Sequence, residues 1–144
     1  MRNLYDDDIA AWATAQAALL RSRQWEALDI DHLAEEIEAV ARAEVRELGS
    51  RTAVQLAHLL KWQYQPARRG NSCLRTIRSQ RRRIVRLLGK MPSLKPVLQD
   101  GEWLEDVWED AVEIAARETG LDDFPQRLPW RLHEVLESDF LPEL

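Results

Sequence analysis

RTAVQLAHLLKWQYQ, residues 51–65, is the most apolar helical stretch of this 144-residue chain. When its residues are spaced about 100° apart around a helix axis, apolar side chains cover more than half of the circumference. The narrow remaining strip holds Arg51, Gln55, His58 and Gln65. A helix that is apolar over so wide an arc is typically buried at the centre of a fold. We therefore expect the rest of the chain to pack around this segment.

The composition favours helix throughout. Leu and Ala together number 38, whereas the β-branched residues Val, Ile and Thr number 18, and all six prolines fall at Pro66 or later. We predict an all-α fold, a single compact domain over residues 1–144. It is a bundle of about four main helices, near residues 7–23, 31–65, 72–89 and 101–119.

Gly49 decides how the centre of this bundle is built. Gly49 and Ser50 either kink one long helix or end a helix and cap the next one. We predict the long kinked helix and keep the chain reversal as the alternative. Elsewhere, carboxylates at residues 6–8, Ser72 and Asp100 are expected to lie at helix N-termini, and Gly120 is expected to end a helix in a left-handed conformation.

Charge is distributed in blocks along the chain. Residues 49–98 contain twelve Lys or Arg and no Asp or Glu, whereas residues 1–47 and 100–144 are acidic. A basic face on the third helix consists of Arg75, Arg78, Arg82 and Arg86. We expect these arginines to pair within the molecule or to face solvent. Nucleic-acid binding through residues 75–86 is an alternative that we do not favour, because the net charge of −5 opposes a polyanion.

Glu44 and Arg81 each interrupt an otherwise apolar arc. Glu44 falls between Val40 and Leu48 on one helix, and Arg81 falls between Leu74 and Leu88 on another. An unpaired buried charge costs several kcal/mol, so we predict that the two form a buried ion pair. The functional alternative is a polar pocket in which Arg81 binds the carboxylate or phosphate of a small molecule whose identity the sequence leaves unknown.

Candidates for catalysis or metal binding are few. The three histidines are scattered, and no Gly-rich phosphate loop or nucleophile motif occurs. His58 with Glu36 or Glu44 is the candidate constellation for an enzyme or a metal-binding bundle. We predict no metal or other cofactor, and whether the chain is an enzyme stays open. The single cysteine, Cys73, is expected to be a buried, unreactive thiol.

The best hypothesis from the residues alone is a non-catalytic interaction or scaffold protein. Six tryptophans, some at the borders of apolar faces, suit either a homo-oligomer interface or a roof over the core. The basic block suits an acidic protein partner. The sequence shows no membrane-spanning run and no secretory signal, so we expect a cytoplasmic protein.

HLLKWQYQPARR at residues 58–69 and TIRSQRRRI at residues 76–84 resemble the bacterial family catalogued as domain of unknown function 29. LYDDDIAAW at residues 4–12, EEIE at residues 35–38 and ETGLDDFP at residues 118–125 match the pattern of the same family. The resemblance implies a compact helical protein from a bacterial cytoplasm. It implies neither an activity nor any catalytic residue.

Overall fold

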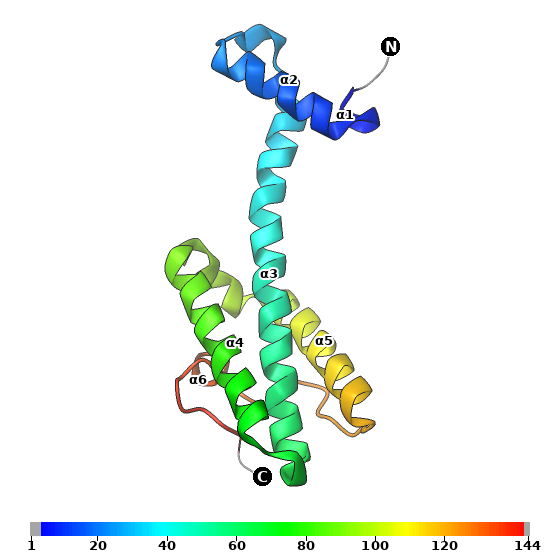
Figure 1. Cartoon of the computed structure of the whole chain (residues 1–144), viewed down its shortest axis with the longest axis vertical. Helices are drawn as coiled ribbons and strands as arrows, with labels where there is room; N and C mark the ends of the chain where they lie inside the picture. Colours follow the sequence, from blue (N-terminus) through cyan, green and yellow to red (C-terminus); the bar gives the residue numbers. More distant parts are fainter. Residues whose placement is uncertain (1–3, 143–144) are drawn as a thin grey trace. The chain divides into compact units, whose positions relative to one another are not determined.

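The computed structural model describes residues 4–142, and those residues form helices and connecting segments without any strand. In chain order the elements are α1 (Leu4–Asp7), α2 (Ile9–Arg21), the 3₁₀ helix η1 (Trp25–Ala27), α3 (Ile30–Tyr64), η2 (Pro66–Arg68), α4 (Asn71–Lys90), η3 (Pro92–Gln99), α5 (Gly101–Thr119) and α6 (Leu132–Val135) (Figure 1). The predicted all-α fold is confirmed, and the four main helices lie close to the predicted ranges.

The internal contacts of the chain fall into two units, one up to Ala43 and the other from Glu44 onward. The boundary lies within α3, which gives its first part to the N-terminal unit and its remainder to the second unit. The single domain over residues 1–144 stays a prediction.

α3 passes through Gly49 and Ser50 without interruption, so the chain does not reverse there. The reason for a glycine at this point is the neighbouring helix α5. A Cβ atom on Gly49 would lie 3.3 Å from Nε1 of Trp103 and 3.5 Å from Cγ2 of Val107. Gly49 is therefore a point of close packing between two helices of the second unit.

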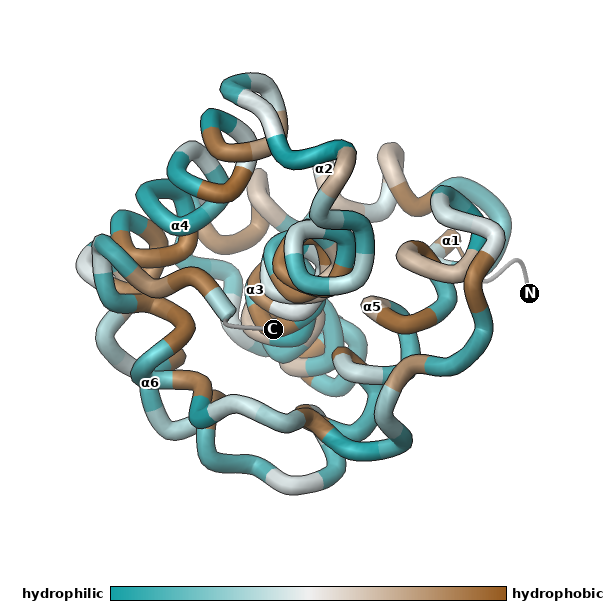
Figure 2. Tube along the Cα trace, turned by 90° about the horizontal axis from the view of Figure 1, so that it is seen from below, coloured by the Kyte–Doolittle hydropathy of each residue, from teal (hydrophilic) through white to brown (hydrophobic). Residues whose placement is uncertain are grey.

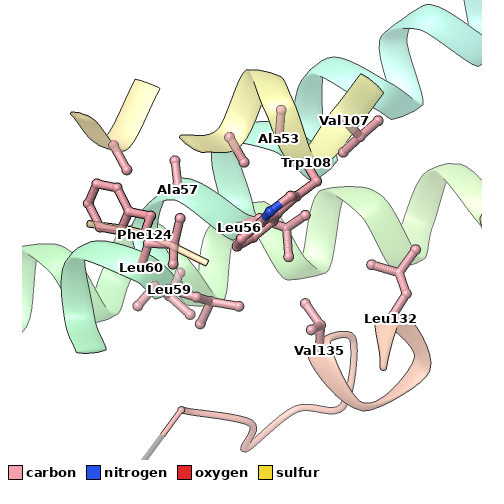
Figure 3. Packing of buried hydrophobic residues seen from close by; sticks show 13 residues of the cluster. Ala53, Leu56, Ala57, Leu59, Leu60, Val107, Trp108, Phe124, Leu132 and Val135 are labelled. Carbon is pink, nitrogen blue, oxygen red and sulfur yellow. The ribbon is translucent and has the colours of Figure 1, made fainter. Parts of the chain in front are cut away.

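The core of the second unit surrounds α3, with α4 and α5 on either side of it (Figures 1 and 2). Apolar residues of α3 meet Val107 and Trp108 of α5 and residues of the C-terminal segment (Figure 3). A smaller cluster consists of Leu48, Ile84, Leu88 and Leu94. The side chains of Leu56, Leu59 and Leu60 are fully buried, as the wide apolar arc of residues 51–65 predicts, and so is that of Leu48.

The position of Gln55 differs from the prediction that it lies on an exposed polar strip of this helix. Its side chain is fully buried, and neither amide atom has a hydrogen-bond partner in the part of the chain that the structure describes. His58 and Gln65, from the same strip, are half-buried. The reason is that Gln55 lies at the edge of the strip beside Thr52 and Leu59, which are both buried, whereas Arg51 and His58 on its other side are half-buried.

Three of the predicted helix ends are confirmed. Asp8 caps α2 by accepting a hydrogen bond from the backbone N–H of Ala11 at 3.0 Å, and Asp100 caps α5 by accepting from Glu102 and Trp103. Gly120 ends α5 with a φ of 74°. Ser72 is not the cap of α4, because that helix begins at Asn71 and is preceded by Gly70, which has no side chain to cap it.

The N-terminal unit is joined by polar bonds around Asp29. Its carboxylate accepts hydrogen bonds from Trp12 Nε1 at 3.0 Å and from His32 Nδ1 at 2.7 Å, and its backbone N–H donates to Gln16. The ring of Tyr5 stacks on His32 with 3.9 Å between ring centroids, and its hydroxyl donates to Glu36 at 2.6 Å. These bonds tie α1 and α2 to the start of α3.

Alanine substitution at two helical glycines, Gly49 and Gly89, separates the effect of close packing on stability from the effect of helix propensity. Gly89 of α4 has open space around its Cα, so Gly89→Ala should raise the free energy of unfolding by about 0.5–1 kcal/mol. Gly49→Ala should gain less, because the new methyl group meets Trp103 and Val107. Urea denaturation of both variants measures the difference. An equal gain at both positions would contradict the close packing at Gly49.

The bond between Asp29 and His32 predicts a pH dependence of the N-terminal unit. The hydrogen bond to Asp29 raises the pKa of His32 above its ordinary value of 6.5, and that to His32 lowers the pKa of Asp29 below 3.8. The His32 contribution to stability is complete below pH 6.5 and is lost as the pH rises through the raised pKa. The Asp29 contribution is complete above pH 3.8 and is lost on acidification.

Nuclear magnetic resonance titration of the His32 ring measures this coupling directly. In the Asp29→Asn variant the pKa of His32 should fall towards its ordinary value, since the largest cause of the shift is removed. Burial, which lowers the pKa of His32, and the charges of Glu35 and Asp6, which raise it, oppose each other and remain in the variant. An unchanged titration midpoint in the variant would show that the bond is absent in solution.

Candidate functional site

Arg81 holds the C-terminal segment of the chain. The side chain is only 5% exposed, as the apolar arc around it predicts. Its Nε donates to the carbonyl of Val135 at 3.1 Å, Nη1 to Ser138 at 2.7 Å and Nη2 to Phe140 at 2.6 Å. Burial lowers the pKa of the guanidinium, and Asp139 opposes this shift. All three nitrogen atoms are thus used within the fold.

The predicted ion pair between Arg81 and Glu44 is replaced by these bonds. No ion pair joins the two residues in the described structure, and Glu44 is half-buried at the edge of another cleft. Three backbone carbonyls stabilise the buried guanidinium in place of a carboxylate, because each accepts a hydrogen bond from one of its nitrogen atoms with a partially negative oxygen. Arg81 is therefore a structural residue, and the alternative that it binds a ligand is not favoured.

The basic face of α4 is open to solvent. Arg75, Arg78, Arg82 and Arg86 are all exposed, and none of them forms an ion pair with a described residue. Arg83 and Arg86, with Lys90 of the same helix and Glu44 of α3, line a cleft of about 420 Å³. The sequence predicts either pairing within the molecule or exposure to solvent for these arginines. Their positions agree with exposure to solvent.

His58 lies in a polar cleft of about 300 Å³. The cleft is made by the end of α3, by η2, by the start of α4 and by the end of α5. Its lining residues are His58, Lys61, Gln65, Arg68, Ser72, Cys73, Thr76 and Glu118. Lys61 Nζ forms an ion pair with Glu118 Oε2 at 2.7 Å, and this bond joins α3 to α5 across the cleft.

Burial favours the uncharged form of two groups of the cleft. Burial lowers the pKa of His58 below its ordinary value, and the bond to Val54 opposes this shift. Burial also raises the pKa of Cys73. The Nδ1 atom of His58 lies 3.0 Å from the carbonyl oxygen of Val54, so Nδ1 carries the proton and Nε2 has a free lone pair. Cys73 is half-buried, less enclosed than the sequence suggests.

The predicted partners of His58 are not those that the cleft contains. Glu36 lies in the N-terminal unit, where it accepts from Tyr5, and Glu44 lines a different cleft. The charged residues that line the cleft with His58 include Lys61 and Glu118 instead of Glu36 and Glu44. Lys61 and Glu118 are 57 positions apart in sequence. Among the described residues, no group of three or more His, Cys, Asp or Glu side chains is placed to hold a metal ion.

A second feature is an uncovered apolar surface on the first part of α3. Ile30, Ile37 and Val40 are 65%, 69% and 65% exposed. The apolar arc of Val40, Glu44 and Leu48, which the sequence predicts to be buried, is therefore exposed over its first part. Leu48 continues the same helical face and is fully buried in the second unit. We call the uncovered surface the N-terminal stripe, and it consists of Ile30, Ala34, Ile37, Val40 and Ala41.

Trp108 borders a further hollow, of about 660 Å³, between α5 and the segment that follows Phe124. Its indole Nε1 donates to the carbonyl of Pro125 at 3.0 Å, so its polar atom serves the fold. None of the described helices is long and apolar enough to cross a membrane.

Substitution of Arg81 tests whether it holds the C-terminal segment. Arg81→Met should lower the free energy of unfolding by about 3 kcal/mol, because three carbonyls lose a charged donor. Arg82→Met, the exposed neighbour, should stay within about 0.5 kcal/mol of the wild type, and so should Glu44→Gln. Chemical denaturation measures all three. A loss in Arg81→Met no larger than in Arg82→Met would refute the assignment.

Comparison with known proteins gives a family and no activity. The family model described as Domain of unknown function DUF29 matches residues 4–141, which is nearly the whole chain. No curated protein and no solved structure matches. This match confirms the resemblance to the same family that residues 58–69 and 76–84 show in the sequence. The chain belongs to the DUF29 family.

Proposed function

We propose that this chain is a non-catalytic interaction protein that pairs with a second copy of itself through the N-terminal stripe. The observation that carries the proposal is the concentration of exposed apolar side chains in one unit. Among the described residues eight large apolar side chains are exposed, and all of them except Val85 precede Ala43. Such a surface is typical of a binding site.

The N-terminal unit also buries little by itself. Only Trp12 and Gln16 are buried among its described residues, and its other stabilising contacts are mainly the polar bonds around Asp29. A segment of about 40 residues with so small a core is marginal on its own. A partner that covers the stripe would supply the missing apolar burial.

The spacing along α3 suits a second helix as this partner. Ile30, Leu33, Ile37 and Val40 follow one another at intervals of three, four and three residues, which is the a and d pattern of packed helices. Ala34 and Ala41 lie beside them, and such small side chains let two helix backbones approach closely. Leu33 is half-buried, so it belongs partly to the core of the N-terminal unit and lies at the border of the stripe.

A second copy of the chain is the partner that the charges favour. No charged side chain interrupts the stripe from Ile30 to Ala41, so it offers nothing to a strongly charged ligand. The exposed ion pair between Glu38 and Arg42 borders the stripe beside Ala34 and Ala41, and its two charges offset each other. Two identical, uncharged stripes related by a two-fold axis would contact each other through the same residues on both copies, as in two-fold homodimers.

Substitution on the stripe should dissociate the dimer. One chain has a mass of 16.8 kDa, and we expect light scattering at micromolar concentration to give twice this value. Ile37→Ser should raise the dimer dissociation constant roughly 100-fold or more, because one substitution removes a buried isoleucine from both copies. Since Ile37 is exposed within its own chain, the helical circular dichroism at high concentration should change little.

Val85→Ser is the matched control, because Val85 is a 50% exposed β-branched residue on α4. This variant should keep the mass of a dimer. A wild-type chain that stays monomeric over the whole concentration range would refute the proposal. So would equal effects of Ile37→Ser and Val85→Ser.

A further inference from the structure

We propose that the cleft beside His58 binds the oxyanion of a small molecule, a phosphate or a carboxylate group. The site goes beyond the proposed self-association and does not depend on it, because every lining residue belongs to the second unit. Its volume of about 300 Å³ lies at the lower end of the range for small-molecule pockets.

The charges of the cleft favour an anion. Lys61 and Arg68 are cations that come from different elements, and Glu118 is the one carboxylate among the lining residues. Because Glu118 is already bonded to Lys61, the guanidinium of Arg68 has no acidic partner in the cleft. The lining therefore carries one excess positive charge when His58 is neutral. An oxyanion could bind both cations at once.

Hydrogen-bond donors lie on the same walls. Ser72 contributes a hydroxyl group, and Gln65 contributes an amide that can donate. Thr76 donates its hydroxyl to the carbonyl of Ser72 at 3.1 Å and so fixes that wall of the cleft. Ser72 of α4 and Gln65 after α3 thus add donors to the two cations, and such a set suits a group whose oxygens accept several hydrogen bonds, as an oxyanion does.

His58 couples the site to pH. The groups that face it are Lys61 of its own helix, Glu118 of α5, Cys73 of α4 and Arg68 of η2. At neutral pH the free lone pair on Nε2 gives an anion no attraction. Protonation adds a positive charge and a second donor, so affinity should rise as the pH falls through the pKa of His58.

Cys73 provides a reporter inside the cleft, because it is the single cysteine of the chain. The rate at which N-ethylmaleimide alkylates the full-length protein can be followed by intact mass. Sulfate represents a phosphoryl group and keeps its charge between pH 5 and 8, and acetate represents a carboxylate. At ten times its dissociation constant the bound probe should slow alkylation roughly tenfold at constant ionic strength.

Arg68→Gln should abolish the protection, and this variant is expected to fold because the side chain of Arg68 is exposed. Arg83→Gln is the matched control, because it removes an exposed arginine that lines a different cleft. Protection by sulfate that only Arg68→Gln removes supports a phosphate site. The same result with acetate alone supports a carboxylate site.

Three results would overturn the proposal. Neither probe protects Cys73, chloride at the same ionic strength protects it equally, or Arg83→Gln removes the protection as well. The pH dependence gives an independent readout. Sulfate should protect at lower concentration as the pH falls, and His58→Gln should remove this dependence. Protection that is equal at all pH values would contradict the assignment of His58 to the site.

Discussion

The burial of one face of α3 is the constraint on which the second unit depends. From Leu48 to Leu60 this helix supplies most of the fully buried side chains, and α4, α5 and the C-terminal segment pack around it. Arg81 completes the enclosure by holding three carbonyls of that segment. The same helical face continues towards Ile30 but is uncovered there. A single uninterrupted helix thus has one part that its own chain covers and one part that it leaves open.

Much of this fold could be predicted from the sequence, because it follows from local signals. The Leu and Ala content, the late prolines, and the caps at Asp8, Asp100 and Gly120 define the helices. Whether Gly49 ends a helix could not be decided in this way. Gly49 and Ser50 carry the signals of a cap, whereas the structure shows that the glycine makes room for Trp103, which is 54 positions away in sequence.

The sites were less accessible to sequence reasoning, because they depend on tertiary placement. The burial of Arg81 could be predicted from its apolar neighbours, but its partners could not, since backbone carbonyls have no sequence signature. The ion pair between Lys61 and Glu118 likewise has no local signal. The apolar arc through Val40 and Leu48 could be predicted from helical periodicity, but the exposure of its first part could not, because periodicity does not show which segment covers a face.

Hydrogen exchange at two protein concentrations tests the central claim most directly, because it compares the two parts of α3 in one experiment. If a second copy covers the N-terminal stripe, the amides of residues 30–41 should exchange more slowly as the concentration rises. Those of residues 48–60, which their own chain covers, should exchange at a rate that does not depend on concentration. Exchange in residues 30–41 that is equally independent of concentration would contradict the account.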